Sequence, residues 1–305
     1  MPCIAYVIEE QTAEVESGET ILQASLRAAI PHAHACGGNA RCSTCRVQIV
    51  EGLDFCCPRN DREQELAARL CFAPEIRLAC QTTLSGDVKL RRLVLDAEDI
   101  KLTAQSGSAG AASIGEEKNL AILFADIRGF TPFAERLLPY DVVHVLNRYY
   151  HEVGRAIIEH GGRIDNYMGD GLLALFGIDD TKGAARQAVR AALGMIAAVE
   201  QLKPYVEMVY GRSFEIGIGI HYGEVIVGAV GVPGMRRVTV IGDAVNLAAR
   251  IESATKRCGV RLLISEATFN ELRDVIRPGK SHRVELAGKS GDYLLYEVSG
   301  LIEAS

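Results

Sequence analysis

Four cysteines near the start of the chain constrain its folding more than any other feature. Cys36, Cys42 and Cys45 follow one another at gaps of five and two residues, and Cys80 stands far downstream. Four thiolates hold an iron–sulfur cluster only when they converge on one small volume, so the chain must fold Cys80 back against the loop. The small residues of that loop, Gly37 among them, suit such a tight turn and let backbone N–H groups approach sulfur.

The use of cysteine also indicates a compartment. Eight of the nine cysteines lie within the first 80 residues, and the N-terminus lacks the charged and apolar regions of a secretory signal. We therefore expect a cytoplasmic protein, in which clustered cysteines serve metal or redox chemistry rather than disulfides. No apolar run approaches the roughly 20 residues that span a bilayer. The net charge is −6 and no basic stripe is present, which argues against a nucleic-acid partner.

A structural zinc site is the main alternative for the four cysteines. Such sites usually pair two short Cys-x-x-Cys units, and this segment has only one, Cys42 to Cys45. The spacing therefore favours a two-iron cluster over zinc or a set of buried thiols. The remaining cysteines of the region fall outside the pattern, and we expect ordinary thiols at Cys3, Cys56, Cys57 and Cys71.

The length of 305 residues favours two domains. Residues 1–95 are rich in alternating strand patterns, with one short helix expected over 21–29 and Thr20 as its N-cap. Residues 103–115 are small and nearly featureless, which predicts a flexible linker over 96–117. In residues 118–300, strands alternate with amphipathic helices. We expect strands over 120–125 and 214–222, a hairpin over 163–176, and helices over 141–160, 181–202 and 244–255.

Two carboxylates are the chemical centre of the second half. Asp126 closes an apolar strand and is followed by Gly129-Phe130-Thr131, which opens a helix. Asp170 lies at the expected tip of the hairpin, between two glycines. Carboxylates placed this way can hold two Mg²⁺ or Mn²⁺ ions, and a helix N-terminus beside them suits a polyphosphate.

Residues 1–95 resemble a [2Fe–2S] ferredoxin of the β-grasp fold. The matching stretches are His34-Ala-Cys-Gly-Gly, Cys42-Ser-Thr-Cys45-Arg-Val and Arg77-Leu-Ala-Cys-Gln. The gap of five residues between Cys36 and Cys42 resembles that of the adrenodoxin-like branch of this family. The resemblance implies a [2Fe–2S] cluster, a redox partner such as a reductase, and four ligands: Cys36, Cys42, Cys45 and Cys80.

Residues 119–298 resemble the catalytic domain of a class III nucleotidyl cyclase, whose core has a ferredoxin-like βαββαβ fold. The resemblance lies in the stretches 123–131, 168–177, 217–225 and 240–250. It implies that Asp126, the Ile127 carbonyl and Asp170 bind the metals, and that Asn246 orients the ribose. Arg250 would then stabilise the transition state at the α-phosphate, and Lys289 would contact the terminal phosphates, with Gly129, Phe130 and Thr131 nearby.

In that family the metal carboxylates and the Asn/Arg pair come from opposite subunits. The resemblance therefore implies a homodimer with two equivalent sites at its interface. The implied reaction converts ATP to 3′,5′-cyclic AMP and pyrophosphate. We further expect the ferredoxin-like half to regulate it through the oxidation, reduction or loss of its cluster.

The base-reading positions depart from the family pattern. Adenylate members usually carry Lys where this chain has Asn166, and often Asp where it has Thr239. An amide can match both the acceptor and the donor of adenine, with Thr239 as helper, so ATP is favoured. Because Asn can be rotated to suit guanine, guanylate cyclase stays open as the alternative.

Two further alternatives follow from the same residues. A catalytically silent second half would leave an electron-transfer ferredoxin with a nucleotide-binding dimerisation domain. Silent members usually lose a metal carboxylate or the Asn/Arg pair, and all four residues are present here. The glycine-rich segment 228–237, with Arg236-Arg237, is expected to form a mobile loop and a solvated turn beside the site.

Overall fold

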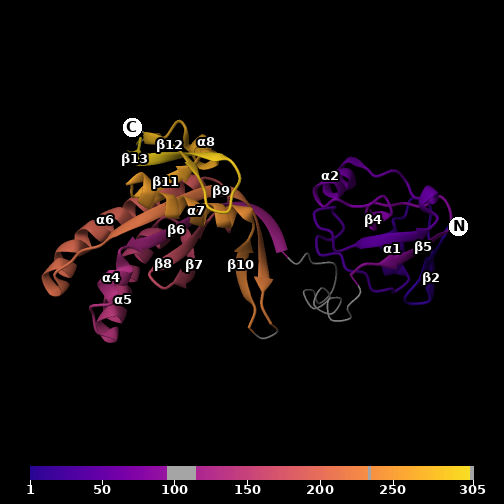
Figure 1. Cartoon of the computed structure of the whole chain (residues 1–305), viewed down its shortest axis with the longest axis horizontal. Helices are drawn as coiled ribbons and strands as arrows, with labels where there is room; N and C mark the ends of the chain where they lie inside the picture. The colour runs from indigo at the N-terminus through magenta and orange to yellow at the C-terminus, as the bar shows by residue number, and fades with distance from the viewer. Residues whose placement is uncertain (95–114, 233–234, 303–305) are drawn as a thin grey trace. The chain divides into compact units, whose positions relative to one another are not determined.

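The computed structural model describes residues 1–94, 115–232 and 235–302. The chain divides into two compact units, Met1–Glu116 and Glu117–Ser305 (Figure 1). The linker expected over 96–117 lies mostly outside the described residues, and its last three residues are the start of a strand. None of the helices in the described ranges is long and apolar enough to cross a membrane.

The first unit is built on one five-stranded sheet of order β2-β1-β5-β3-β4. Neighbouring strands run antiparallel except β1 and β5, which are parallel. This mixed sheet with a helix packed on it confirms the predicted β-grasp fold. Its elements are β1 (Cys3–Tyr6), β2 (Gln11–Glu14), α1 (Ile21–Arg27), β3 (Arg46–Glu51), the 3₁₀ turn η1 (Leu53–Phe55), α2 (Asp61–Arg69), β4 (Ile76–Leu78) and β5 (Val88–Arg92).

Helix α1 forms where the sequence predicts it and ends earlier. Thr20 caps it with a reciprocal pair of bonds: its Oγ1 accepts from the Gln23 N–H at 3.3 Å, and the Gln23 Oε1 accepts from the Thr20 N–H at 2.9 Å. The helix stops at Arg27, before the expected end, because Ala29 takes a left-handed backbone conformation with φ 56°.

The second unit has an eight-stranded sheet of order β12-β13-β11-β9-β6-β8-β7, with β10 paired to β9 off this path. Strands β9 and β11 are parallel, whereas β7, β8 and β6 form an antiparallel series. The elements are β6 (Gly115–Arg128), α4 (Phe130–Ala134), α5 (Pro139–Glu159), β7 (Gly162–Met168), β8 (Gly171–Phe176), α6 (Ala184–Tyr210), β9 (Glu215–Val230), β10 (Arg237–Ile241), α7 (Asp243–Cys258), β11 (Leu262–Ser265), α8 (Glu266–Leu272), β12 (Ile276–Glu285) and β13 (Asp292–Leu301).

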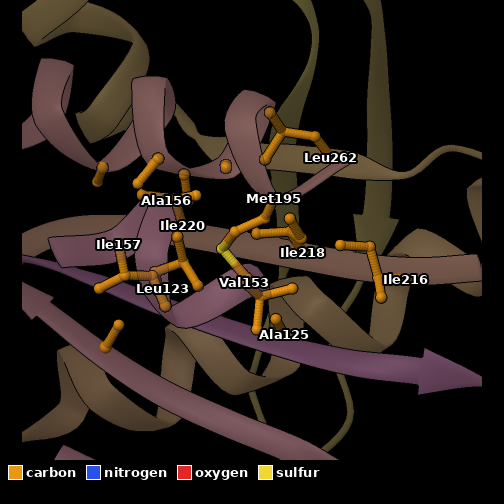
Figure 2. Packing of buried hydrophobic residues seen from close by; sticks show 14 of the residues in the cluster. Leu123, Ala125, Val153, Ala156, Ile157, Met195, Ile216, Ile218, Ile220 and Leu262 are labelled. Carbon is orange, nitrogen blue, oxygen red and sulfur yellow. The ribbon is translucent and has the colours of Figure 1, made fainter. Parts of the chain in front are cut away.

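Alternation along β6 separates two cores on the two faces of this sheet. Leu123 and Ala125 point to the main core, which α5 and α6 cover (Figure 2). Leu120 and Ile122 point to the other face, where they pack with residues of α7. Helices α5 and α6 lie side by side on their face (Figure 1). The same alternation therefore aims the side chain of Asp126 at the α7 face.

Two elements are longer than the sequence suggests. Helix α6 continues through Pro204 and ends at Gly211, whose φ of 69° breaks the helix. Strand β9 runs on to Val230, because its second half pairs with β10 from Ile226 to Val230. The prediction of a mobile loop over 228–237 is therefore wrong at both ends of that segment. Residues 228–230 belong to β9, and Arg237 is the first residue of β10.

Candidate functional site

The four predicted cluster cysteines come together as two pairs. The Sγ atoms of Cys45 and Cys80 are 3.5 Å apart in a buried position, and Cys36 and Cys42 form a hydrogen-bonded pair nearer the surface. Within the described ranges, no three His, Cys, Asp or Glu side chains form a preassembled metal site. Two pairs nevertheless match the needs of a two-iron cluster, in which each iron takes two protein ligands.

Hydrogen-bond donors around the sulfurs fit a bound cluster. The Cys42 thiol, and then the backbone N–H groups of Arg41, Asn39 and Gly38, lower the pKa of Cys36 to about 4. Donation from Cys45, and then from Gln81, likewise lowers the pKa of Cys80 to about 6. The Gln81 Nε2 lies 3.3 Å from the Cys80 Sγ. The same thiol-to-thiol bonds raise the pKa of Cys42 and Cys45, so each pair holds one proton that must leave before iron can bind all four sulfurs as thiolates.

A buried ion pair that we did not predict from the sequence supports the fourth ligand. The Glu63 carboxylate accepts from the Arg77 guanidinium at 3.0 and 2.9 Å and from the Leu78 N–H at 2.7 Å. Both side chains are buried. Since Leu78 lies two residues before Cys80, α2 fixes the segment that delivers this ligand. The signal in the sequence is a charged residue, Arg77, inside an apolar strand.

In the second unit the two predicted metal carboxylates face each other. Asp126 lies near the end of β6, and Asp170 lies in the turn between β7 and β8. Burial, followed by the charge of Asp170 and a hydrogen bond with it, raises the pKa of Asp126 to about 6. A divalent cation bound between the two side chains would compensate the charge of Asp170 that disfavours ionisation of Asp126. The donor set is therefore suited to the predicted Mg²⁺ or Mn²⁺. The side chain of Ile127 is buried and has no metal-binding atom, so only its backbone carbonyl could contribute to the cation site.

Two residues around Asp170 fix the turn. A Cβ on Gly171 would lie 3.1 Å from the Asp126 Oδ1 and 3.2 Å from the Ala125 carbonyl oxygen, so only glycine gives this spacing without displacement. The Tyr150 hydroxyl of α5 lies 2.5 Å from the Gly169 carbonyl oxygen and 3.3 Å from that of Gly171. Tyr150 therefore holds the turn on both sides of Asp170. Sequence reasoning did not identify it, because it reads as one more residue of an amphipathic helix.

The residues expected near phosphate lie on α4 and α7. Gly129 caps α4 with φ 70°, followed by Phe130 and the exposed Thr131. Asn246 and Arg250 are exposed on α7, and their spacing of four places them on one side of the helix. The Lys289 ammonium pairs with the carboxylate of Asp243, the first residue of α7. The structure thus brings the distant Lys289 to the helix that carries Asn246 and Arg250.

The two predicted base-reading positions have different surroundings. Asn166 is exposed on β7. The Thr239 hydroxyl on β10 donates to the Asp165 Oδ2 at 2.8 Å, and the Arg237 guanidinium donates to the Asp165 carbonyl oxygen at 2.9 Å. Sequence reasoning missed Asp165, because strict strand alternation would aim it away from the face of Asn166. A register shift between Ile164 and Asn166 removes that alternation.

Comparison with known families decides the classification of both halves. Residues 113–300 match the adenylate and guanylate cyclase catalytic domain. The chain belongs to this cyclase family. Residues 6–85 match the 2Fe-2S iron-sulfur cluster binding domain, which confirms the predicted two-part organisation of a [2Fe–2S] domain followed by a cyclase domain.

Individual relatives include cyclases of both base specificities. An adenylate cyclase of Anabaena cylindrica is 42% identical over 167 residues, which is 53% of this chain and 32% of that protein. The chain thus spans about a third of that curated relative. The structure of the guanylyl cyclase Cya2 aligns with a TM-score of 0.58 at 35% identity, covering 62% of this chain and 95% of that one. The adenylyl cyclase CyaB from P. aeruginosa aligns at 0.54 and 31% identity, covering 62% and 96%.

Proposed function

We propose that the second unit is an adenylate cyclase, which converts ATP to 3′,5′-cyclic AMP and pyrophosphate. The observation that carries the proposal is the opposed pair of Asp126, near the end of β6, and Asp170, in the turn that leads into the neighbouring strand β8, in a chain of the cyclase family. When bound there, Mg²⁺ or Mn²⁺ would help to ionise the 3′-hydroxyl and would neutralise phosphate charge. The protein's part is to hold the carboxylates in place; for Asp170 the Tyr150 contacts to the turn contribute to this.

The proposed active unit is a homodimer. Asn246 and Arg250 are exposed, as groups that serve the site of a second subunit must be. Exposed apolar side chains on β9 and β10 support an interface there, namely Ile226, Val238 and Ile241. In such a dimer the Arg250 guanidinium would stabilise charge at the α-phosphate, and the Asn246 amide would orient the ribose so that its 3′-oxygen is in line for attack.

Lys289 is proposed to contact the terminal phosphates. It lies at the start of α7, where its ammonium is already held by the carboxylate of Asp243. A triphosphate would offer it oxygens in place of that carboxylate. Gly129, Phe130 and Thr131, which open α4, would lie along the same phosphates with their backbone N–H groups.

ATP is the proposed substrate because of the groups offered to the base. The Asn166 amide can donate to N1 of adenine and accept from its 6-amino group, and Thr239 supplies a second contact. Guanylate cyclase is the second candidate, since the relatives include Cya2 as well as adenylate cyclases.

We further propose that the [2Fe–2S] unit regulates the cyclase. Support comes from the fusion of the two domains in one chain and from the complete set of four cysteine ligands. Oxidation, reduction or loss of the cluster would shift the equilibrium between active and inactive dimers. A reductase is the proposed electron donor. None of the nine cysteines, all of which lie in the described ranges, forms a disulfide, which suits the proposed cytoplasmic location.

One assay tests the catalytic proposal. Protein purified anaerobically is given ATP or GTP with Mn²⁺, and the cyclic nucleotide and pyrophosphate are measured. We expect cyclic AMP and pyrophosphate in equal amounts, with GTP the poorer substrate and Asp126→Asn inactive. Reversible one-electron reduction without product from either nucleotide would instead support an electron-transfer protein.

The regulatory proposal needs its own assay. Cyclic AMP production is compared with the cluster oxidised, reduced and removed, at one protein concentration. We expect the rates to differ between these states. Identical rates in all three would remove the regulatory role and leave the catalytic proposal intact.

A further inference from the structure

The contact between Asp165 and Thr239 has chemical consequences for the base. A threonine hydroxyl has one proton to donate and two lone pairs that accept. The Thr239 proton is committed to the Asp165 Oδ2 at 2.8 Å. A carboxylate can only accept, so this hydrogen bond has one direction. What Thr239 offers to any further group is therefore an acceptor.

The position of Asp165 in the fold makes this contact possible. On β7, Ile164 pairs with Ala174 of β8 and Asn166 with Leu173, so Asp165 is the extra residue of a bulge. Bulges redirect side chains and are frequent beside active sites. Here the bulge turns a carboxylate toward β10, a strand that is not paired with β7.

Neighbouring groups hold Asp165 in place. Its side chain is only 7% exposed, and its Oδ1 lies 3.6 Å from the Arg163 guanidinium. Arg237 of β10 donates to its backbone carbonyl oxygen. The carboxylate is thus bonded on one oxygen to Thr239 and paired on the other with a cation. This arrangement limits its freedom to release the hydroxyl.

We propose that Asp165 is a positioning residue for base recognition, which fixes Thr239 as a hydrogen-bond acceptor and thereby selects adenine over guanine. The 6-position of adenine carries an amino donor, whereas that of guanine carries an oxygen acceptor. An acceptor on the protein pairs with the first and opposes the second. The inference rests on the proposed cyclase function and on Thr239 facing the base.

The proposal explains how this chain can read adenine without the lysine and aspartate usual in adenylate members. Thr239 alone would be ambiguous, because a free hydroxyl rotates to suit either purine. Asp165, which is not itself proposed to contact the base, fixes the direction of the Thr239 hydroxyl. The Asn166 amide can rotate, so it can adopt the orientation that suits the base accepted by Thr239.

Substrate analogues test the direction of the hydroxyl in the unmodified protein. Catalytic efficiency (kcat/KM) is measured for ATP, for purine riboside triphosphate, which lacks the 6-substituent, and for inosine triphosphate, which carries a 6-oxygen. We expect ATP to exceed purine riboside triphosphate, and inosine triphosphate to be the poorest, with steps of about tenfold. Inosine triphosphate used better than purine riboside triphosphate would overturn the proposal, because it would show a donor at this position.

Variants test the part played by Asp165. In Asp165→Ala and Asp165→Asn the hydroxyl is free to turn, so the ratio of efficiencies for ATP and GTP should fall about tenfold. The fall should come from better use of GTP as well as poorer use of ATP. In a Thr239→Val background the same changes at Asp165 should leave the ratio unmoved. Asp274→Asn, an exposed carboxylate outside the site, is the matched control and should leave the ratio as in wild type.

Failure of this inference is distinguishable from failure of the proposed function. No cyclic product from either purine nucleotide, or a wild-type preference for GTP, would refute adenylate cyclase itself. Equal losses with ATP and GTP in Asp165→Ala, at an unchanged ratio, would make Asp165 a merely structural residue. Should both Asp165 variants fail to fold, the analogue series in the wild-type protein still decides the direction of the hydroxyl.

Discussion

The cluster site and the candidate catalytic site are assembled in opposite ways. All four proposed cysteine ligands lie in the first unit. Two of them are buried, and the buried ion pair of Glu63 and Arg77 fixes the segment that carries Cys80. In the second unit the opposed carboxylates are half-buried, whereas Asn246 and Arg250 are exposed on α7. The proposed ligands of the first site all come from one chain, and the second site is proposed to need another copy. Cluster binding should therefore be independent of protein concentration, and catalysis should depend on it.

Loss of a metal carboxylate should have the largest effect and would test the catalytic side of this contrast. Asp170→Ala should lower cyclic AMP formation about a thousandfold, since it removes half of the cation site. The melting temperature should hold or rise, because the repulsion between the two carboxyl groups is gone. An enzyme that keeps a tenth of its activity would refute the assignment of Asp170 as a metal ligand.

Mixing two inactive variants tests whether the site is shared. Asp170→Ala and Arg250→Ala should each be inactive alone. In a randomly formed mixture about half of the dimers are hybrids, and each hybrid regains one of its two sites, so about a quarter of wild-type activity should return. Activity assays on co-expressed and separately expressed chains measure this. A mixture that stays inactive would place all catalytic residues within one chain and remove the contrast.

Substitution of a buried cysteine tests the self-contained site. Cys45→Ser should reduce bound iron from about two atoms per chain to near zero and abolish the visible absorption of the cluster. Cys71→Ser, at an exposed thiol outside the pattern, is the matched control and should retain both. Full iron content in the Cys45 variant would exclude it as a ligand.

The buried ion pair predicts a smaller change, in stability rather than in activity. Glu63→Ala leaves Arg77 buried without its partner and should cost the first unit about 3–5 kcal/mol of unfolding free energy. Urea unfolding followed by the cluster absorption measures it. The exposed pair of Glu51 and Lys89 provides a control, since Glu51→Ala should cost less than about 1 kcal/mol. Equal losses of unfolding free energy in the two variants would show that burial of the Glu63–Arg77 pair does not add to its contribution to stability.

The helix cap should show the smallest effect. Thr20→Ala removes the hydroxyl that accepts from the Gln23 N–H, whereas the Thr20 backbone N–H can still donate to the Gln23 Oε1; the loss should cost about 1 kcal/mol. The same unfolding experiment detects this, while the cyclase rate at saturating ATP should be unchanged. A cost above about 3 kcal/mol would show that Thr20 also supports the neighbouring strand segments.

Local patterns predicted the elements and the motifs of this protein well. The cap at Thr20, the hairpin with Asp170 in its turn and the helix that carries Asn246 and Arg250 all follow from spacing and turn chemistry. Element ends were less accurate where a tertiary partner sets them. Strand β9 is extended because β10 pairs with it, and nothing within 214–222 indicates that pairing.

The supporting contacts of the sites could not be predicted. Glu63 meets Arg77 from another element, and Asp165 reaches Thr239 only because of a bulge that shifts one residue. Tyr150 contacts carbonyl groups 19 and 21 residues away. Such contacts depend on the three-dimensional arrangement of strands and helices, which periodicity does not encode.

The Tyr150 contacts tie the movement of a helix to the chemistry of the site. Because the hydroxyl reaches the carbonyl groups on both sides of Asp170, a shift of α5 along its axis would either break these contacts or move the turn that carries this carboxylate. The exposed side chains of the N-cap Leu138 and of Tyr140 lie at the N-terminal end of α5, whereas Tyr150 lies near the middle of the helix. A displacement there would be transmitted along about three turns of α5 to Tyr150, and through Tyr150 to the turn that carries the proposed cation ligand Asp170.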